Sequence, residues 1–175
     1  ASGSPACEYT AVGFSKRNSN RNKDILFFED EMKAVAKNLY VCTDDGSYGF
    51  HGNGSQQLQA LVDAGNTYDC CVAIGPMIMM KFTCLLTKKL EIPTIVSMNP
   101  IMVDGTGMCG ACRLIVDGKV KFACVAGPEF DGHLVDFDQA MKRQQQYKTE
   151  EGRAKLAYEE GATHHGGCGN CGGDK

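Results

Sequence analysis

Short apolar runs alternate with helix-like segments through the first hundred residues. Runs rich in β-branched and aromatic side chains predict four strands, at 8–14, 39–45, 68–76 and 92–100. Three segments with helical spacing, the first opening on a strand-like apolar stretch, lie between them, at 24–39, 54–65 and 77–90. Repeated strand and helix units of this kind predict an α/β fold with a parallel sheet of the nucleotide-binding type.

The pattern changes after residue 100. Residues 101–135 combine a Gly-rich loop with two apolar runs, and Asp117-Gly118 between those runs favours a hairpin turn. Residues 136–175 begin with a polar helix to Glu160, with Asp136 as the expected N-cap, and end in a tail rich in Gly, Cys and His. We therefore expect three parts: a truncated α/β domain at 1–100, a small metal-binding subdomain at 101–135, and a helix with its tail at 136–175.

Charge and hydropathy exclude two classes of partner. The 175 residues include 18 Lys and Arg against 21 Asp and Glu, and the basic residues form no stripe of the kind that nucleic acid requires. No apolar run approaches the roughly 20 residues that cross a bilayer, and no secretory signal is visible. We expect a cytoplasmic protein with neither a nucleic acid nor a membrane partner.

The ten cysteines are informative about chemistry. In a reducing compartment, clustered cysteines indicate metal ligands rather than disulfides. Four cysteines lie apart from the clusters, in apolar surroundings: Cys42, Cys70, Cys71 and Cys84. We expect these four to fill the core.

Three cysteines follow the spacing of an iron-sulfur site. Plant-type ferredoxins hold a two-iron, two-sulfur (2Fe-2S) cluster with a Cys-x4-Cys-x2-Cys run and a distant fourth Cys. Cys109 and Cys112 match the second and third positions, Cys124 matches the distant one, and Asp104 occupies the first. A carboxylate can ligate iron with the same formal charge as a thiolate. The glycines of this loop provide positive φ angles and N–H groups for cluster sulfur, at Gly105, Gly107 and Gly110.

Other readings of this region remain open. His133, which follows the hairpin, is the competing candidate for the fourth ligand in place of Asp104. The three thiols also suit zinc with some other partner, or no metal, with Asp104 as a turn residue. A four-cysteine zinc ribbon usually shows two close pairs, however, whereas Cys124 stands alone in its strand. The spacing therefore favours the iron-sulfur interpretation.

The C-terminal tail holds a second group of potential ligands. His164, His165, Cys168 and Cys171 lie within eight residues and suit a tetrahedral zinc site or a second iron-sulfur centre. The alternative is a Gly-rich terminus that binds metal only adventitiously. The two interpretations are equally weighted.

The segment from Ile92 to Asp138, with its Asp-x4-Cys-x2-Cys motif, resembles the small subunit of NADH-dependent reduced ferredoxin:NADP oxidoreductase, also described as sulfide dehydrogenase. Segments 22–35, 39–52 and 73–82 are similar to the nucleotide half of the same ferredoxin-NADP reductase-like subunits. Such subunits carry a flavin-binding barrel and a Gly-rich first strand before the part that this chain matches. The resemblance therefore implies that FAD and NAD(P) are doubtful in this chain alone.

Two short segments resemble remnants of a nucleotide site at the carboxyl ends of predicted strands. They are Asp44-Asp45 and Gly75-Pro76-Met77, and open α/β sheets bind ligands at such ends. Both are also common turn sequences, so retention of dinucleotide binding is the weaker expectation.

The resemblance implies an electron-transfer subunit rather than a catalytic one. Its 2Fe-2S cluster relays single electrons in a multi-subunit NAD(P)H and ferredoxin oxidoreductase, in the family an electron-bifurcating complex. The implied partners are a large glutamate-synthase-like flavoprotein and, by further analogy, hydrogenase or dehydrogenase subunits. Two alternatives stay open: an NAD(P)-binding flavoenzyme subunit whose flavin domain comes from another chain, and a structural zinc-binding scaffold.

Overall fold

The computed structural model describes residues 10–15, 28–43, 45–159 and 161. The strands are β1 (Thr10–Ser15), β2 (Asn38–Thr43), β3 (Phe50–His51), β4 (Cys71–Ile74), β5 (Thr94–Ser97), β6 (Arg113–Val116), β7 (Lys119–Phe122) and β8 (Glu129–Asp131). The helices are α1 (Glu29–Val35), α2 (Gly54–Asp63), α3 (Met77–Lys89), α4 (Ala123–Ala126), α5 (Phe137–Gln144) and α6 (Lys148–Glu159). The mixed α/β composition predicted from the sequence is confirmed.

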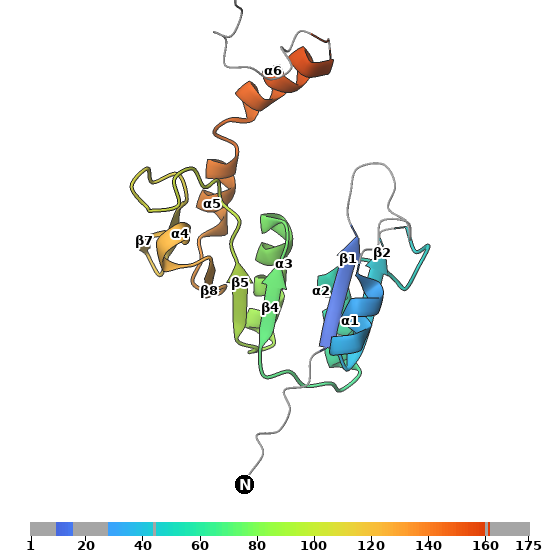
Figure 1. Ribbon diagram of the computed structural model, residues 1–175. Coiled ribbons are helices and arrows are strands. Elements are labelled where there is room, and N and C mark those ends of the chain that lie inside the picture. The colour runs from blue at the N-terminus through green and yellow to red at the C-terminus, as the bar shows by residue number, and fades with distance from the viewer. Residues whose placement is uncertain (1–9, 16–27, 44, 160, 162–175) are drawn as a thin grey trace, which may run out of the picture.

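The strands form two three-stranded sheets and one hairpin. Strands β1, β2 and β3 pair in parallel, as do β4 and β5, whereas β8 joins the other edge of β5 in antiparallel orientation. Figure 1 shows β1 and β2 with α1 and α2 on one side of the molecule, and β4 and β5 with α3 on the other. Parallel pairing is confirmed for the predicted strands, and β8 is an addition.

The expectation of one continuous parallel sheet is not met. In the described part of the chain, no ladder joins β1 to β4. Val72 and Ile74 of β4 remain 60% and 71% exposed, although a strand inside a parallel sheet is normally covered on both faces. Helices α2 and α3 connect the two halves, and a hydrogen bond of 3.2 Å joins Ser55 to Thr83.

A hydrophobic core lies under α3, β5, β6 and α5. Met80, Val96 and Leu114 are at most 1% exposed, and Phe137 and Ala140 bring α5 into the same core. Burial of side chains of this size is worth roughly 1.5–3 kcal/mol each. The core therefore joins the hairpin and α5 to β4 and β5. The predicted part boundaries stay predictions.

The hairpin prediction is confirmed. Strands β6 and β7 pair in antiparallel register, with Val116 opposite Lys119 across the turn. Asp117 and Gly118 have φ angles of 52° and 67°, as a two-residue type I′ turn requires.

The predicted polar helix from 136 to 160 is two helices. Asp136 caps α5 as expected, since its Oδ1 accepts the Gln139 N–H at 3.0 Å. The helix ends at Gln144, and α6 begins at Lys148 with no buried residue. Burial of one face therefore holds α5 on the core, whereas α6 extends away from it (Figure 1).

The four predicted core cysteines divide into two kinds. Cys42 and Cys84 are 0% and 4% exposed, and burial raises their pKa values to about 11 and about 12. Cys71 is half-buried, and Cys70 is exposed. The core prediction is therefore wrong for Cys70, which precedes the first residue of β4 and lies outside the core.

In the described part of the chain, no helix has the length and apolar character to cross a membrane.

Candidate metal centre

Asp104 organises the loop that precedes β6. Its Oδ1 accepts the Thr106 N–H at 2.9 Å, and its Oδ2 accepts the Cys109 N–H at 2.8 Å. These hydrogen bonds hold the pKa of the Asp104 carboxyl below its usual value, and the bond from Thr106 has the largest effect. Each carboxylate oxygen accepts one of these N–H bonds and keeps a further lone pair for a metal. Asp104 thus shapes the turn through these hydrogen bonds, and its carboxylate can still bind a metal.

The loop bends through glycines. Gly105, Gly107 and Gly110 have φ angles of 77°, 84° and 66°, which confirms the expected positive φ positions. A Cβ on Gly107 would lie 2.9 Å from Val125 Cγ2, so a side chain there would force the Val125 side chain to shift. The loop therefore approaches α4 closely at Gly107.

Cys112 and Cys124 meet through the hairpin. Cys112 directly precedes β6 and is 2% exposed, and Cys124 lies in α4 directly after β7. Their Sγ atoms are 3.2 Å apart, and the Ala123 N–H donates to the Cys112 carbonyl at 3.2 Å. The predicted return of Cys124 to the loop is confirmed.

The two thiols of this pair form one hydrogen bond and influence each other's pKa. Burial pushes the pKa of Cys112 upward, but N–H groups and the Cys124 thiol outweigh that effect and the pKa is lowered. The pKa of Cys124 is raised, first by its hydrogen bond with Cys112. The environment therefore favours the thiolate form at Cys112, and both residues would bind a metal as thiolates.

Cys109 lies on the exposed side of the loop beside Asp104. Its Sγ accepts the Ala111 N–H at 3.4 Å, while its own N–H donates to Asp104. The Gly107 N–H favours the ionised forms of both Asp104 and Cys124. The four predicted ligands thus stand as two pairs, Asp104 with Cys109 and Cys112 with Cys124.

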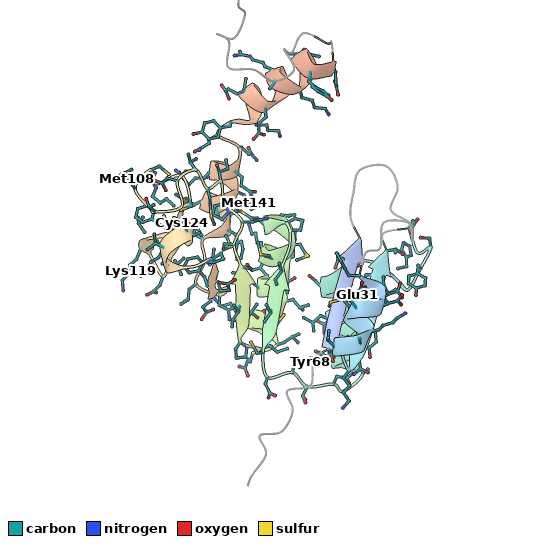
Figure 2. All side chains as sticks on the ribbon, in the orientation of Figure 1. Glu31, Tyr68, Met108, Lys119, Cys124 and Met141 are labelled. Carbon is teal, nitrogen blue, oxygen red and sulfur yellow. The ribbon has the colours of Figure 1, made fainter. Side chains whose placement is uncertain are left out.

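No three His, Cys, Asp or Glu side chains gather closely enough to hold one metal ion, as far as the described residues extend. The two pairs are therefore distinct in the structure. Figure 2 shows Met108 of the loop and Cys124 of α4 at the same end of the molecule. Met108 is 88% exposed, so the loop presents an apolar side chain to solvent next to Cys109.

His133, the alternative fourth ligand, is engaged elsewhere. Its Nε2 lies 3.1 Å from Thr87 Oγ1, and its backbone N–H donates to Asp131 at 2.9 Å. Thr87 is buried and also accepts the Thr94 hydroxyl at 2.6 Å. His133 thus belongs to a polar network between α3 and β5 and is not brought to the cysteine pairs.

The nucleotide-site candidates are partly described. Asp45 follows β2, and its Oδ1 accepts the N–H and the hydroxyl of Ser47, which hold the pKa of this carboxyl below its usual value. Asp44 lies outside the described residues. Gly75 follows β4 with φ at 155°, Pro76 is the N-cap of α3, and Met77 is 3% exposed.

The side chain of Met77 therefore packs in the core. Asp45 and Gly75 follow strands of different sheets. Nucleotide binding at these residues stays a prediction. The tail candidates His164, His165, Cys168 and Cys171 also lie outside the described residues.

The sequence analysis missed one contact of the loop. Arg143 Nη2 donates to the carbonyl oxygens of Gly110 and Ala111, at 3.3 Å each. Helical spacing from the buried Ala140 was the available signal, since Arg143 follows it by three positions on one helix face. Which loop this face contacts was not visible from spacing.

Residues 99–136, which contain all four predicted ligands, match the family model described as the iron-sulfur cluster binding domain of dihydroorotate dehydrogenase B. Fold and site thus agree with the class of electron-transfer subunits that carry an iron-sulfur domain. The family resemblance drawn from the sequence is confirmed.

Individual relatives make the likeness more specific. The chain is 66% identical over 158 residues to a Clostridium beijerinckii protein named only for its position in the adh 3′ region, covering 89% of this chain and 53% of that protein. It is 50% identical over 139 residues to the Thermotoga maritima dihydroorotate dehydrogenase B (NAD(+)) electron transfer subunit homolog, covering 79% and 48%. The chain spans about half the length of these curated relatives.

A solved structure shares the fold. A chain in the structure of NADH-dependent reduced ferredoxin-NADP oxidoreductase, solved for insight into flavin-based electron bifurcation, superposes with a TM-score of 0.73 at 40% identity. The match covers 89% of this chain and 62% of that one. This is the family that the sequence segment resembles.

Proposed function

We propose that this chain is an iron-sulfur electron-transfer subunit whose 2Fe-2S cluster is held by Asp104, Cys109, Cys112 and Cys124. The observation that carries the proposal is the division of these ligands into two pairs. A two-iron cluster needs two protein ligands on each iron, whereas a structural zinc site needs four ligands around one ion. The pairs therefore suit the cluster better than zinc.

The surroundings of the pairs support the same proposal. Backbone N–H groups point at the ligand atoms: Cys109 at Asp104, and Ala111 at Cys109. Such donors stabilise the negative charge of thiolates and of cluster sulfur. Each oxygen of Asp104 has a lone pair left for iron after it accepts one N–H.

Burial of the pairs is unequal. Cys112 is 2% exposed, whereas Cys109 is exposed and Met108 beside it is 88% exposed. When bound, a 2Fe-2S cluster accepts and releases one electron at a time. The chain's own contribution is to exclude water at Cys112 and to present an apolar edge at Cys109 and Met108, where a redox partner can approach.

The partners are part of the proposal. Relatives of this chain are named as electron-transfer subunits of a dehydrogenase, and the solved structure is that of an electron-bifurcating oxidoreductase. We propose a larger flavoprotein subunit as the direct partner, with NAD(P)H and ferredoxin serving the complex and with hydrogenase or dehydrogenase subunits as further members. A second metal at the C-terminal tail is a separate proposal, supported only by its four potential ligands.

Anaerobic purification and cluster analysis test this function. We expect iron and acid-labile sulfide in a one-to-one ratio, and a rhombic spin-half electron paramagnetic resonance signal after reduction with dithionite. Cys70→Ser is the matched control, because Cys70 is exposed and lies outside the loop. Zinc without iron or sulfide in anaerobically prepared protein would contradict the proposal and favour the scaffold alternative.

A further inference from the structure

Helix α5 carries an arginine against the loop of the proposed ligands. Phe137 and Ala140, which are 6% and 1% exposed, fix the helix in the core, and Asp136 caps its first turn. The helix also packs against α3 and β6. Arg143 lies in the last turn of α5, and the packing of α5 against α3 and β6 therefore fixes its position.

Arg143 contacts the two residues that separate Cys109 from Cys112. Its Nη2 donates to the Gly110 and Ala111 carbonyl oxygens at 3.3 Å each. No ion pair joins its guanidinium to a carboxylate of the described residues. The positive charge of Arg143 is therefore directed at two neutral peptide groups.

One of these two peptide groups, between Gly110 and Ala111, faces sulfur at its other end. The Ala111 N–H shares a peptide group with the Gly110 carbonyl, and it donates to Cys109 Sγ at 3.4 Å. A cation at the oxygen end of an amide polarises the group and strengthens the hydrogen bond made by its N–H.

One further nitrogen of the guanidinium is shielded from solvent. Arg143 Nε is buried and has no partner among the described residues, and the same is true of Gln139 Oε1 one turn earlier. A charge in such surroundings is screened less than an exposed one. The charge of Arg143 is therefore screened less at the loop than the charge of a fully exposed arginine would be.

We propose that Arg143 is a positioning residue of the cluster site, which holds the segment from Cys109 to Cys112 with an N–H group toward sulfur and raises the reduction potential. The inference rests on the proposed function. Hydrogen bonds to cluster sulfur and nearby positive charge both favour the reduced cluster, because reduction adds negative charge. Neither effect requires Arg143 to touch the cluster.

Redox titration of Arg143→Met tests the inference. We expect the variant to keep its cluster and to show a more negative midpoint potential. The ratio of reduced to oxidised cluster at a fixed potential falls about tenfold, which corresponds to about 59 mV for one electron. Loss of iron to a chelator should also be faster, by about tenfold, because the loop loses its clamp.

Two further variants make the result specific. Arg143→Lys keeps the charge but loses the planar fork, so we expect a smaller shift in the same direction. Arg153→Met on the exposed helix α6 is the matched control and should leave both quantities unchanged. If Arg143→Met does not fold by circular dichroism, Arg143→Lys carries the test alone.

The outcomes separate the two proposals. Wild-type protein that assembles no iron and sulfide overturns the proposed function and this inference with it. A wild-type cluster together with an unchanged potential and chelation rate in the folded Arg143 variants overturns the inference alone.

Discussion

The Sγ atoms of Cys112 and Cys124 lie 3.2 Å apart, although the two residues are 12 positions apart in the chain. The β6–β7 hairpin produces this contact, because its register pairs the neighbouring residues Arg113 and Phe122. Cys112 is buried in the core, so both the core and the hairpin fix the position of its sulfur atom. The geometry of the hairpin therefore controls the proposed metal site.

Replacement of either thiol of this pair should prevent cluster assembly. For Cys124→Ser we expect iron and labile sulfide to fall by about tenfold or more, because a neutral hydroxyl is a poor ligand for iron. Quantification of iron and sulfide after anaerobic reconstitution measures the effect. Cys84→Ser, at a buried cysteine outside the loop, is a matched control that should keep its cluster. Full loading of the Cys124 variant would remove this residue from the ligand set.

Asp104→Cys should keep the cluster and change its potential. A thiolate donates more electron density to iron than a carboxylate does, so we expect a more negative midpoint potential. Spectroelectrochemical titration and electron paramagnetic resonance spectra of the two proteins measure the change. An identical spectrum and potential would mean that Asp104 serves the loop through its N–H contacts but does not bind iron.

The loop should be sensitive to acid through Asp104 before the cluster is loaded. The pKa of Asp104 is lowered by the N–H groups of Thr106 and Cys109, whereas an unfolded aspartate titrates near about 3.9. The ionised Asp104 carboxyl therefore contributes its full stabilisation to the folded loop above a pH of about 3.9. This contribution is lost as the pH falls through the lower pKa of Asp104 in the folded state. Nuclear magnetic resonance of the Asp104 carboxyl and of the two amides should show one common transition below about 3.9.

Asp104→Asn is the control for this titration. The amide keeps an acceptor oxygen but no ionisable group, so the transition at the two N–H groups should disappear. A carboxyl that titrates at or above the unfolded value would show that the hydrogen bonds do not favour its ionised form.

Gly118→Ala should destabilise the hairpin without a steric clash. Gly118 has φ at 67° and nothing lies within 4 Å of a Cβ placed there, so the cost is conformational. We expect about 1 kcal/mol and a melting temperature lower by about 2–4 °C. Thermal unfolding followed by circular dichroism measures the change.

Gly152→Ala is the matched substitution in a helix. Gly152 lies in α6 without positive φ, and a Cβ there also meets nothing within 4 Å. We expect more helical signal, because alanine favours a helix by about 1 kcal/mol, and no loss of stability. Equal destabilisation by both substitutions would contradict the role assigned to backbone conformation at Gly118.

Sequence patterns of short range were sufficient for several elements. Asp117-Gly118 defines its turn because few residue pairs tolerate two positive φ angles, and Asp136 caps α5 through its own side chain. The Asp-x4-Cys-x2-Cys spacing identified a loop that the structure closes with Asp104. Each of these signals depends on atoms only a few residues apart.

Tertiary structure alone decided the features that depend on distant parts of the chain. Composition placed Cys70 with the core cysteines, but burial is set by the covering layers, and Cys70 is exposed. The position of His133 after the hairpin made it a candidate ligand, but in the structure its ring lies within hydrogen-bond distance of Thr87 instead.

The division of the strands into two sheets and the contact of Arg143 with the loop have the same origin. Ladder pairing and helix packing join residues dozens of positions apart, and local preference does not encode which partner is found. The sequence by itself therefore determined the ligand spacing, the turn and the cap, because those rest on local backbone geometry. The fold decided which of the proposed ligands lie together and that Arg143 contacts their loop, because these contacts depend on how α5 and the hairpin pack on the core.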